Sequence, residues 1–470
     1  MIDLFARIRR DEQGVAMMIA VTLSFVVAML AALMFSVATH TDQATARGRH
    51  FTQALHVTES GIEHAIAKIE EADGALPSTT FSGETELGDY DVTITRLPRN
   101  RYTITSTGGV RRGRVLGAER TIQVTLEPPL SFEKALFSYT TVETKNNDII
   151  DGDVWGNHNV ILASGTQVYG SVVAATGYVD LGGGSIVDGD VISGGFNPSP
   201  AFAIRLAANA QVGGDATASV VSVACVGADN ADYKILLNTG SLIGGNVKTF
   251  GTVNNSGGII GGTISQNVCT QAEPSEPLPE YTFNESNYDS VTYFGTPSLA
   301  SLTAVTEFQT YLTATGNQLS GAFYINQADP VNQGTRIDLT NTVITGDTTL
   351  ITNTPVFTNG TTDNGSDIIF TLISTYDPPA GTSCDVNYDL SECSFHLKNN
   401  FSTTGTTAVL VHSPYGPVAI KNNAEMFGAI FADSIQVKNN QTMSYDDRVG
   451  RVVGFGEVTL EITGWREIPS

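Results

Sequence analysis

The longest apolar run of the chain lies close to its N-terminus. Residues 15–38 read VAMMIAVTLSFVVAMLAALMFSVA, which is 24 residues without a charge. As a helix rising about 1.5 Å per residue, this run spans roughly 36 Å, enough to cross a bilayer. Small and aliphatic residues then recur at helical spacing from Ala54 to Ile69. This pattern predicts one helix over residues 15–74, transmembrane in its first half.

Beyond the helix, polar and apolar residues alternate with the period of β-strands. Segments that begin at Tyr90, Tyr102 and Thr121 carry this alternation. They predict a small antiparallel sheet over residues 75–130, packed on the second half of the helix. Pro128 and Pro129 close this unit.

From residue 131 onward a short motif recurs, consisting of Gly, a small polar residue and then usually Val or Ile. Its copies begin at Gly152, Gly170, Gly189, Gly214, Gly245 and Gly262. The successive intervals are 18, 19, 25, 31 and 17 residues. Such intervals favour the turns of a parallel β-solenoid, in which each turn is stable only when stacked on its neighbours. An irregular β-sandwich is the alternative architecture.

A second repeat, Lys-Asn-Asn, occurs four times in the same region. Its copies begin at Lys145, Lys398, Lys421 and Lys438. Asparagine at the corners of stacked turns can form hydrogen-bonded ladders, so this repeat also favours the solenoid.

The expected fold class is therefore α+β followed by all-β. The predicted parts are a leader (1–14), the long helix (15–74), the small sheet (75–130), a first solenoid part (131–270), a linker or insertion with one short helix (271–317), and a second solenoid part with a C-terminal cap (318–470). Trp465 is expected to cover the last turn, because open solenoid ends need covering.

The charge divides the chain in the same place. The 470 residues carry 25 Lys and Arg against 48 Asp and Glu, a net charge of −23. Residues 1–130 account for −2 of this charge, and residues 131–470 for −21. A strongly acidic chain without a basic patch argues against nucleic acid as a partner. High Gly content and few charges are typical of exported β-proteins.

The four cysteines all lie in the acidic region. They are Cys225, Cys269, Cys384 and Cys393. The simplest of the three possible pairings joins Cys225 to Cys269 and Cys384 to Cys393, and four buried thiols are the alternative. The seven histidines do not cluster with them, so no zinc site is expected.

The segment before the apolar run is basic and ends in glycine. It reads MIDLFARIRRDEQG, and Arg7, Arg9 and Arg10 should hold it in the cytoplasm while the rest of the chain is exported. A short basic leader, then Gly14, then an apolar helix resembles a type IV prepilin. The resemblance implies that a prepilin peptidase cleaves between Gly14 and Val15, leaving a mature N-terminus that is methylated. A plain signal-anchor helix is the alternative.

The resemblance extends to minor pilins of the PilX-like family. The segment ALHVTESGIEHAIAKI, and the C-terminal segments around GAIFADS and ITGWREIPS, are similar to that family. Most major pilins carry Glu at the fifth mature position, where this chain has Ile19. The resemblance therefore implies a subunit at or near a filament tip. Its expected partners are other pilins, the prepilin peptidase, the inner-membrane assembly platform and a surface or secreted ligand. The residues expected to face lipid and then neighbouring helices include Val15, Ile19, Phe25, Leu30 and Phe35.

Candidate chemistry in the acidic region is sparse. Turn carboxylates such as Asp148, Asp153 and Asp190 offer oxygen ligands for calcium, but their order matches no calcium loop. Neither paired carboxylates in a basic setting nor a hydrolase motif is evident. His158 and His412 are isolated in the sequence, and Asp433, Asp446 and Asp447 are explained as turn residues.

We therefore expect no enzymatic activity, no cofactor and no metal. The expected location is the cytoplasmic membrane, with a single pass and an exported C-terminal region, and then the filament or cell surface. An anchored structural or adhesive surface protein outside any filament, and a carbohydrate-active β-helix enzyme, are the competing functions.

Overall fold

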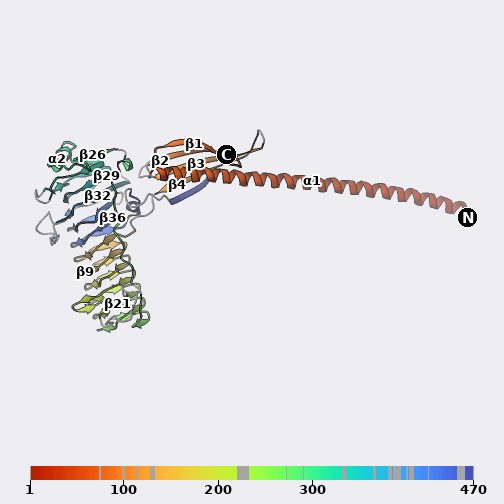
Figure 1. Cartoon of the computed structure of the whole chain (residues 1–470). Coiled ribbons are helices and arrows are strands. Elements are labelled where there is room, and N and C mark those ends of the chain that lie inside the picture. Colours follow the sequence, from red (N-terminus) through yellow and green to blue (C-terminus); the bar gives the residue numbers. More distant parts are fainter. Residues whose placement is uncertain are drawn as a thin grey trace. The chain divides into compact units, whose positions relative to one another are not determined.

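The computed structural model divides into two compact units, Met1–Glu127 with Thr459–Ser470 as unit 1 and Pro128–Val458 as unit 2. It describes residues 2–470 except 73–75, 98–100, 113–114, 128–132, 220–231, 271, 289, 331–334, 364–366, 379–383, 385–392, 399–400, 402–406, 422, 453–460 and 469–470. Each unit is described by itself (Figure 1).

Unit 1 consists of one long helix and an antiparallel sheet. The helix is α1 (Ile2–Glu71). The strands, in their order across the sheet, are β1 (Thr79–Glu84), β2 (Asp89–Leu97), β3 (Arg101–Arg112), β4 (Val115–Glu127) and β39 (Glu461–Ile468). The strands at Tyr90, Tyr102 and Thr121 lie where the alternation predicts them. The fifth strand comes from the far end of the chain, which local alternation could not reveal.

The second half of α1 packs on this sheet. Alternate residues of the strands, among them Val92, Ile104 and Val124, are buried against Val57, Ala65 and other apolar residues of the helix. Burial of each such side chain contributes roughly 1.5–3 kcal/mol. The helical stripe and the strand alternation thus meet in one core.

Unit 2 is a stack of short strands in two large sheets, and every pairing between the described strands of these sheets is parallel. The 21-stranded sheet contains β5 (Leu136–Ser138), β7 (Ile149–Asp151), β8 (Val154–Gly156), β10 (Gln167–Val168), β11 (Val172–Ala174), β13 (Ile186–Val187), β14 (Val191–Ser193), β18 (Gln211–Val212), β19 (Ala216–Ala218), β21 (Leu242–Ile243), β22 (Val247–Thr249), β24 (Ile259–Ile260), β25 (Ile264–Gln266), β26 (Val291–Phe294), β27 (Gln318–Ile325), β29 (Val343–Thr352), β31 (Thr362–Asp363), β32 (Ile368–Ser374), β34 (Thr407–Ser413), β36 (Glu425–Ala432) and β38 (Thr442–Ser444).

The 11-stranded sheet of unit 2 lies across the core from the first. It contains β6 (Thr141–Glu143), β9 (Asn159–Leu162), β12 (Val179–Leu181), β17 (Ile204–Leu206), β20 (Ile235–Leu237), β23 (Val253–Asn255), β28 (Ile337–Asp338), β30 (Val356–Asn359), β33 (Phe395–Lys398), β35 (Val418–Ile420) and β37 (Ile435–Val437). Buried Val, Ile and Leu side chains from both sheets form one continuous core. We call one turn of chain that contributes to both sheets a layer.

The layers do not follow chain order throughout. The chain enters in the middle of the stack at β5 and winds to β25, then crosses to β26 and winds back until β36, β37 and β38 pair in parallel with β5, β6 and β7. In Figure 1 the labels accordingly run β26, β29, β32, β36, β9 and β21 along the unit. The predicted first and second parts of the β-region are therefore one stack, joined at the layer where the chain enters.

Residues 272–288 and 290, the return segment, connect the two halves. They lie along the outer face of the 21-stranded sheet, where the Asn157 side chain bonds the backbone of Glu276 twice, at 2.6 and 3.1 Å. Leu278, Tyr281, Phe283 and Tyr288 pack against a cluster that includes Trp155 and Phe431. The predicted linker is thus a packed segment, followed by the short helix α2 (Ala304–Ala314).

The remaining elements are short. They are the hairpin β15 (Asn197–Pro198) and β16 (Ala201–Phe202), and two 3-10 turns, η1 (Glu285–Asn287) and η2 (Asp447–Arg451). The hairpin lies within the 25-residue interval between motif copies, and so accounts for its length.

The polar residue of each Gly motif forms a ladder that crosses the layers. Asp153 accepts from the backbone of Ser171 at 2.7 Å, and the Ser171 hydroxyl accepts from Asp190 at 3.2 Å. Asp190 in turn accepts from Asp215, Asp215 from Asn246 and Asn246 from Thr263. The motif therefore recurs because its polar side chain accepts a hydrogen bond from a backbone amide of the next layer.

Removing one rung of the ladder tests this role. Asp215→Ala leaves the backbone amide of Asn246 without its 2.6 Å acceptor, and should lower the free energy of unfolding by about 1–3 kcal/mol. Asp188→Ala, at an exposed turn carboxylate, is the matched control and should change it by less than about 0.5 kcal/mol. Urea denaturation measures the free energy of unfolding of both variants. An equal decrease in the two would show that the ladder does not stabilise unit 2.

Candidate functional site

The first half of α1 exposes its apolar residues on all sides. From Met17 onward the helix has a window with a mean hydropathy of 2.5 in which no residue is buried. Ile19, Phe25, Leu30 and Phe35 are each more than half exposed, up to 76% at Phe35. Among the described residues, one helix is therefore long and apolar enough to cross a membrane. Gly14 and Val15 also lie within α1.

At its other end the same helix is seated on the sheet by close backbone contacts. A Cβ atom at Gly61 would lie 2.4 Å from the Ser106 Oγ, so only glycine fits there. The Ser106 hydroxyl donates to the Thr58 carbonyl at 2.8 Å, and the Thr58 hydroxyl donates to the Arg120 carbonyl at 3.1 Å. These two hydrogen bonds and the close contact at Gly61 fix the register of the helix on β3 and β4.

Several turn carboxylates of unit 2 accept hydrogen bonds from backbone amides. Besides the ladder, Asp148 is fully buried and accepts from the amides of Lys145 and Gln441, both at 3.0 Å. Burial raises the pKa of this carboxyl, and the two amide bonds oppose the rise. Among the described residues no group of three His, Cys, Asp or Glu side chains is placed to hold a metal ion.

The isolated ionisable residues lie in different settings. His158 is exposed, and burial raises the pKa of Asp433 against the opposing effect of His158. Asp446 forms an ion pair with Arg448, which also contacts Asp367 at 3.2 Å. Burial would raise the pKa of Asp446, but its hydrogen bonds from Arg448 hold it below the usual value. These contacts give the carboxylates structural partners.

His412 connects the core to the return segment. Its ring is fully buried, and Nε2 lies 2.7 Å from the Pro279 carbonyl. A carbonyl can only accept, so Nε2 carries the proton. Burial lowers the pKa of His412 to about 4, although the bond to Pro279 favours the charged form.

The structure describes three of the four cysteines, and it also describes Trp465. Cys384 and Cys393 form a disulfide and both are buried. Cys269 is also disulfide-bonded, while Cys225 lies outside the described residues. Trp465 does not cover the end of the stack as expected. It lies in β39, paired with Val124 in unit 1, and is 57% exposed, because the terminal strand extends the antiparallel sheet.

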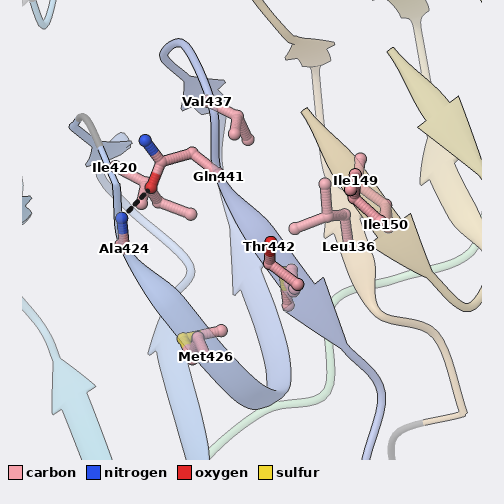
Figure 2. Close-up of a pocket in the computed structure, with 10 residues that line it drawn as sticks. Leu136, Ile149, Ile150, Ile420, Ala424, Met426, Val437, Gln441 and Thr442 are labelled. Carbon is pink, nitrogen blue, oxygen red and sulfur yellow. Dashed lines mark hydrogen bonds between the residues drawn. The ribbon is translucent and has the colours of Figure 1, made fainter. Parts of the chain in front are cut away.

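A small cavity lies where the two halves of the stack meet. Its volume is about 10 Å³, no more than the space one water molecule needs. Figure 2 shows its lining residues, with the Gln441 side chain accepting from the Ala424 amide at 2.7 Å. The others drawn come from both halves and are Leu136, Ile149, Ile150, Ile420, Met426, Val437, Thr442 and Met443. The cavity is a packing defect at the junction and too small for a ligand.

Comparisons with known proteins add little. No family model matches the chain, and no curated protein matches it in sequence. Among solved structures, it is similar to the competence-associated pilin ComZ from Thermus thermophilus, with 10% identity and a TM-score of 0.22, over 89% of this chain and 97% of that chain. A TM-score that low establishes neither a common fold nor a common function.

The close contact between α1 and the sheet can be tested by substituting Gly61. Gly61→Ala should lower the free energy of unfolding of unit 1 by about 1–3 kcal/mol, because the new methyl group overlaps Ser106. Gly48→Ala has open space around it and should be neutral or slightly stabilising. Thermal unfolding in detergent compares the pair, and a stable Gly61→Ala protein would contradict the close contact.

The buried histidine predicts a pH dependence. A group whose pKa falls from 6.5 in the unfolded chain to about 4 in the fold binds more protons when unfolded, so stability is lost as the pH falls below 6.5. For His412 this loss is about 2 kcal/mol between pH 7 and pH 5. Urea denaturation at the two pH values should show a smaller difference for His412→Gln than for the unmodified protein. An equal difference for the two proteins would contradict the role given to His412.

Proposed function

We propose that this chain is a non-enzymatic minor pilin or pseudopilin, similar to the PilX-like family, that acts at or near the tip of a type IV pilus-like filament. The observation that carries the proposal is the course of α1. A basic segment ends at Gly14, a membrane-length apolar helix follows, and the same helix continues without interruption into the core of an antiparallel sheet. A signal-anchor has no need of such rigid continuity.

The peptide bond between Gly14 and Val15 is the proposed processing site. Cleavage there removes Arg7, Arg9 and Arg10, the charges that hold the leader on the cytoplasmic side. The helix that remains begins with an apolar residue and can leave the bilayer to pack among other pilin helices. The prepilin peptidase, the inner-membrane assembly platform and other pilins are the partners that this route requires.

Ile19 supports a position at the tip. In the pilins that this chain resembles, a Glu at the fifth mature position pairs with the N-terminus of a neighbour. A buried carboxylate is costly and is kept only for such a purpose. Ile19 is apolar and exposed on α1, so this subunit can start a filament without docking onto an earlier subunit.

Unit 2 is the displayed head in this proposal. We interpret its parallel layers as a β-solenoid. Residues 131–470, most of which belong to unit 2, carry a net charge of −21, which keeps stacked strands soluble. Its size, more than 300 residues, would crowd a filament surface if every subunit carried it. That also favours a rare or terminal position, from which the head primes assembly, adheres to a surface or binds a secreted substrate.

Processing gives the most direct test. In the native host, the mature protein should begin at Val15 with a methylated amine, as measured by intact mass and N-terminal sequencing. Gly14→Leu should block cleavage and leave a full-length precursor in the membrane. Gly48→Ala, in the same helix but outside the leader, is the control and should be processed normally.

Recovery of the unmodified protein with Met1 to Gly14 still attached would contradict the proposal. It would favour the alternative function, an anchored structural or adhesive surface protein that never enters a filament.

A further inference from the structure

The two ends of the stack in unit 2 differ (Figure 1). At one end lies α2, whose Ala304, Phe308 and Leu312 are buried in the continuous core. At the other end the last layer consists of β23, β24 and β25. Among the described strands, each of these three pairs only with the layer before it. We call residues 251–268, which include this layer, the open end.

The apolar core of the stack reaches solvent at the open end. Val247 and Ile243 are fully buried in the layer before the last one. Their partners in the last layer are Ile264, which is 49% exposed, and Ile260, which is half-buried. Ile259 in the same layer is 64% exposed. Positions that form the core in earlier layers are therefore exposed in this one.

The sequence of the open end carries none of the residues that usually keep sheet edges apart. Proteins protect exposed strand edges with charged residues and Pro, and the end repeats of a stack need a polar outer face. Residues 249–272 contain no charged residue and no Pro, and they form the longest uncharged run within residues 131–470. The polar position of the Gly motif, which is Asp in three earlier layers, is Thr263 here. Such an edge is suited to pairing with another one.

We propose that a second copy of this chain binds the open end, so that two stacks meet end to end across a two-fold rotation axis. The open end presents three strand edges around an exposed apolar centre, and the same end of a second copy presents a matching set. A single strand from another protein would pair with one of these edges only. A lipid surface would leave the backbone groups of all three edges without hydrogen bonds.

The distribution of charge favours the open end for self-association. Two copies with a net charge of −23 each repel one another. Contact through the open end places uncharged residues against uncharged residues, while the acidic remainder of each stack extends away from the contact. A basic partner, by contrast, would find no carboxylate side chain within residues 249–272.

The association should stop at two copies. Because α2 covers the other end of the stack, a pair joined in this way has used both of its open ends, and an isologous contact of this kind gives a closed dimer instead of a fibre. The inference goes beyond the proposed function and does not depend on it. Pairing of two stacks requires neither cleavage after Gly14 nor entry into a filament.

The test uses the full chain with one copy in each lipid nanodisc, so that α1 of one copy cannot associate with α1 of another. Sedimentation velocity at increasing protein concentration measures the dissociation constant of paired discs. Ile264→Lys should raise this constant at least about tenfold, because two lysines then meet across the rotation axis. Since the substitution makes the chain less acidic, a general effect of net charge would act in the opposite direction.

Gln211→Lys is the matched control. Gln211 is an exposed residue of β18, in a middle layer, and the same charge there should change the dissociation constant less than about twofold. Thermal unfolding verifies that both variants are folded. Ile259→Lys, at a more exposed position of the last layer, replaces Ile264→Lys if that variant does not fold.

The inference is overturned if the unmodified protein remains as single discs up to about 100 μM, or if the variant of the last layer pairs as tightly as the unmodified protein. Equal weakening by Gln211→Lys would show that the contact lies elsewhere. Assemblies of three or more discs would contradict the closed, two-copy arrangement.

Discussion

The apolar surface of the first half of α1 is the constraint on which the rest of the molecule depends. Fourteen large apolar residues between Met17 and Val37 are exposed in the part of the chain that the structure describes. Burial contributes roughly 1.5–3 kcal/mol for each such side chain, so their exposure to water costs on the order of 20 kcal/mol. That exceeds the 5–15 kcal/mol that typically stabilises a domain. The segment is long and apolar enough to lie in a bilayer, which would remove this cost.

The order of the layers in the parallel stack brings the two chain ends of unit 2 close together. The chain enters the stack at β5, between its two halves, and leaves it near β38, which pairs with β7. Consecutive winding alone would leave the two chain ends at opposite ends of the stack. The return segment brings the chain back from one end of the stack to the other. It is held by Asn157 and by the hydrogen bond between His412 and Pro279. After the stack, β39 rejoins the sheet of unit 1.

Local pattern predicts those parts of the structure whose cause is local. The continuous helix, the strands after Tyr90 and Tyr102, and the Gly motif follow from spacing that one segment carries by itself. Pairing between distant segments does not follow from local spacing. Trp465 of β39 pairs with β4, and Ile430 of β36 pairs with β5, and both pairings are set by tertiary contacts. The Lys-Asn-Asn repeat is visible in the sequence, but only the register of β33, β35, β37 and β6 places its four lysines in one row. The burial of His396 has no signal in the sequence, because its neighbour Phe357 comes from another layer.

The central claim is that α1 leaves the membrane and packs within a filament. Quantitative mass spectrometry of filaments sheared from the native host measures this most directly. The account predicts peptides from both unit 1 and unit 2 in the sheared fraction, at far lower abundance than the major subunit, and their loss when the major subunit is deleted. Peptides found only in the membrane fraction, with or without filaments, would contradict it.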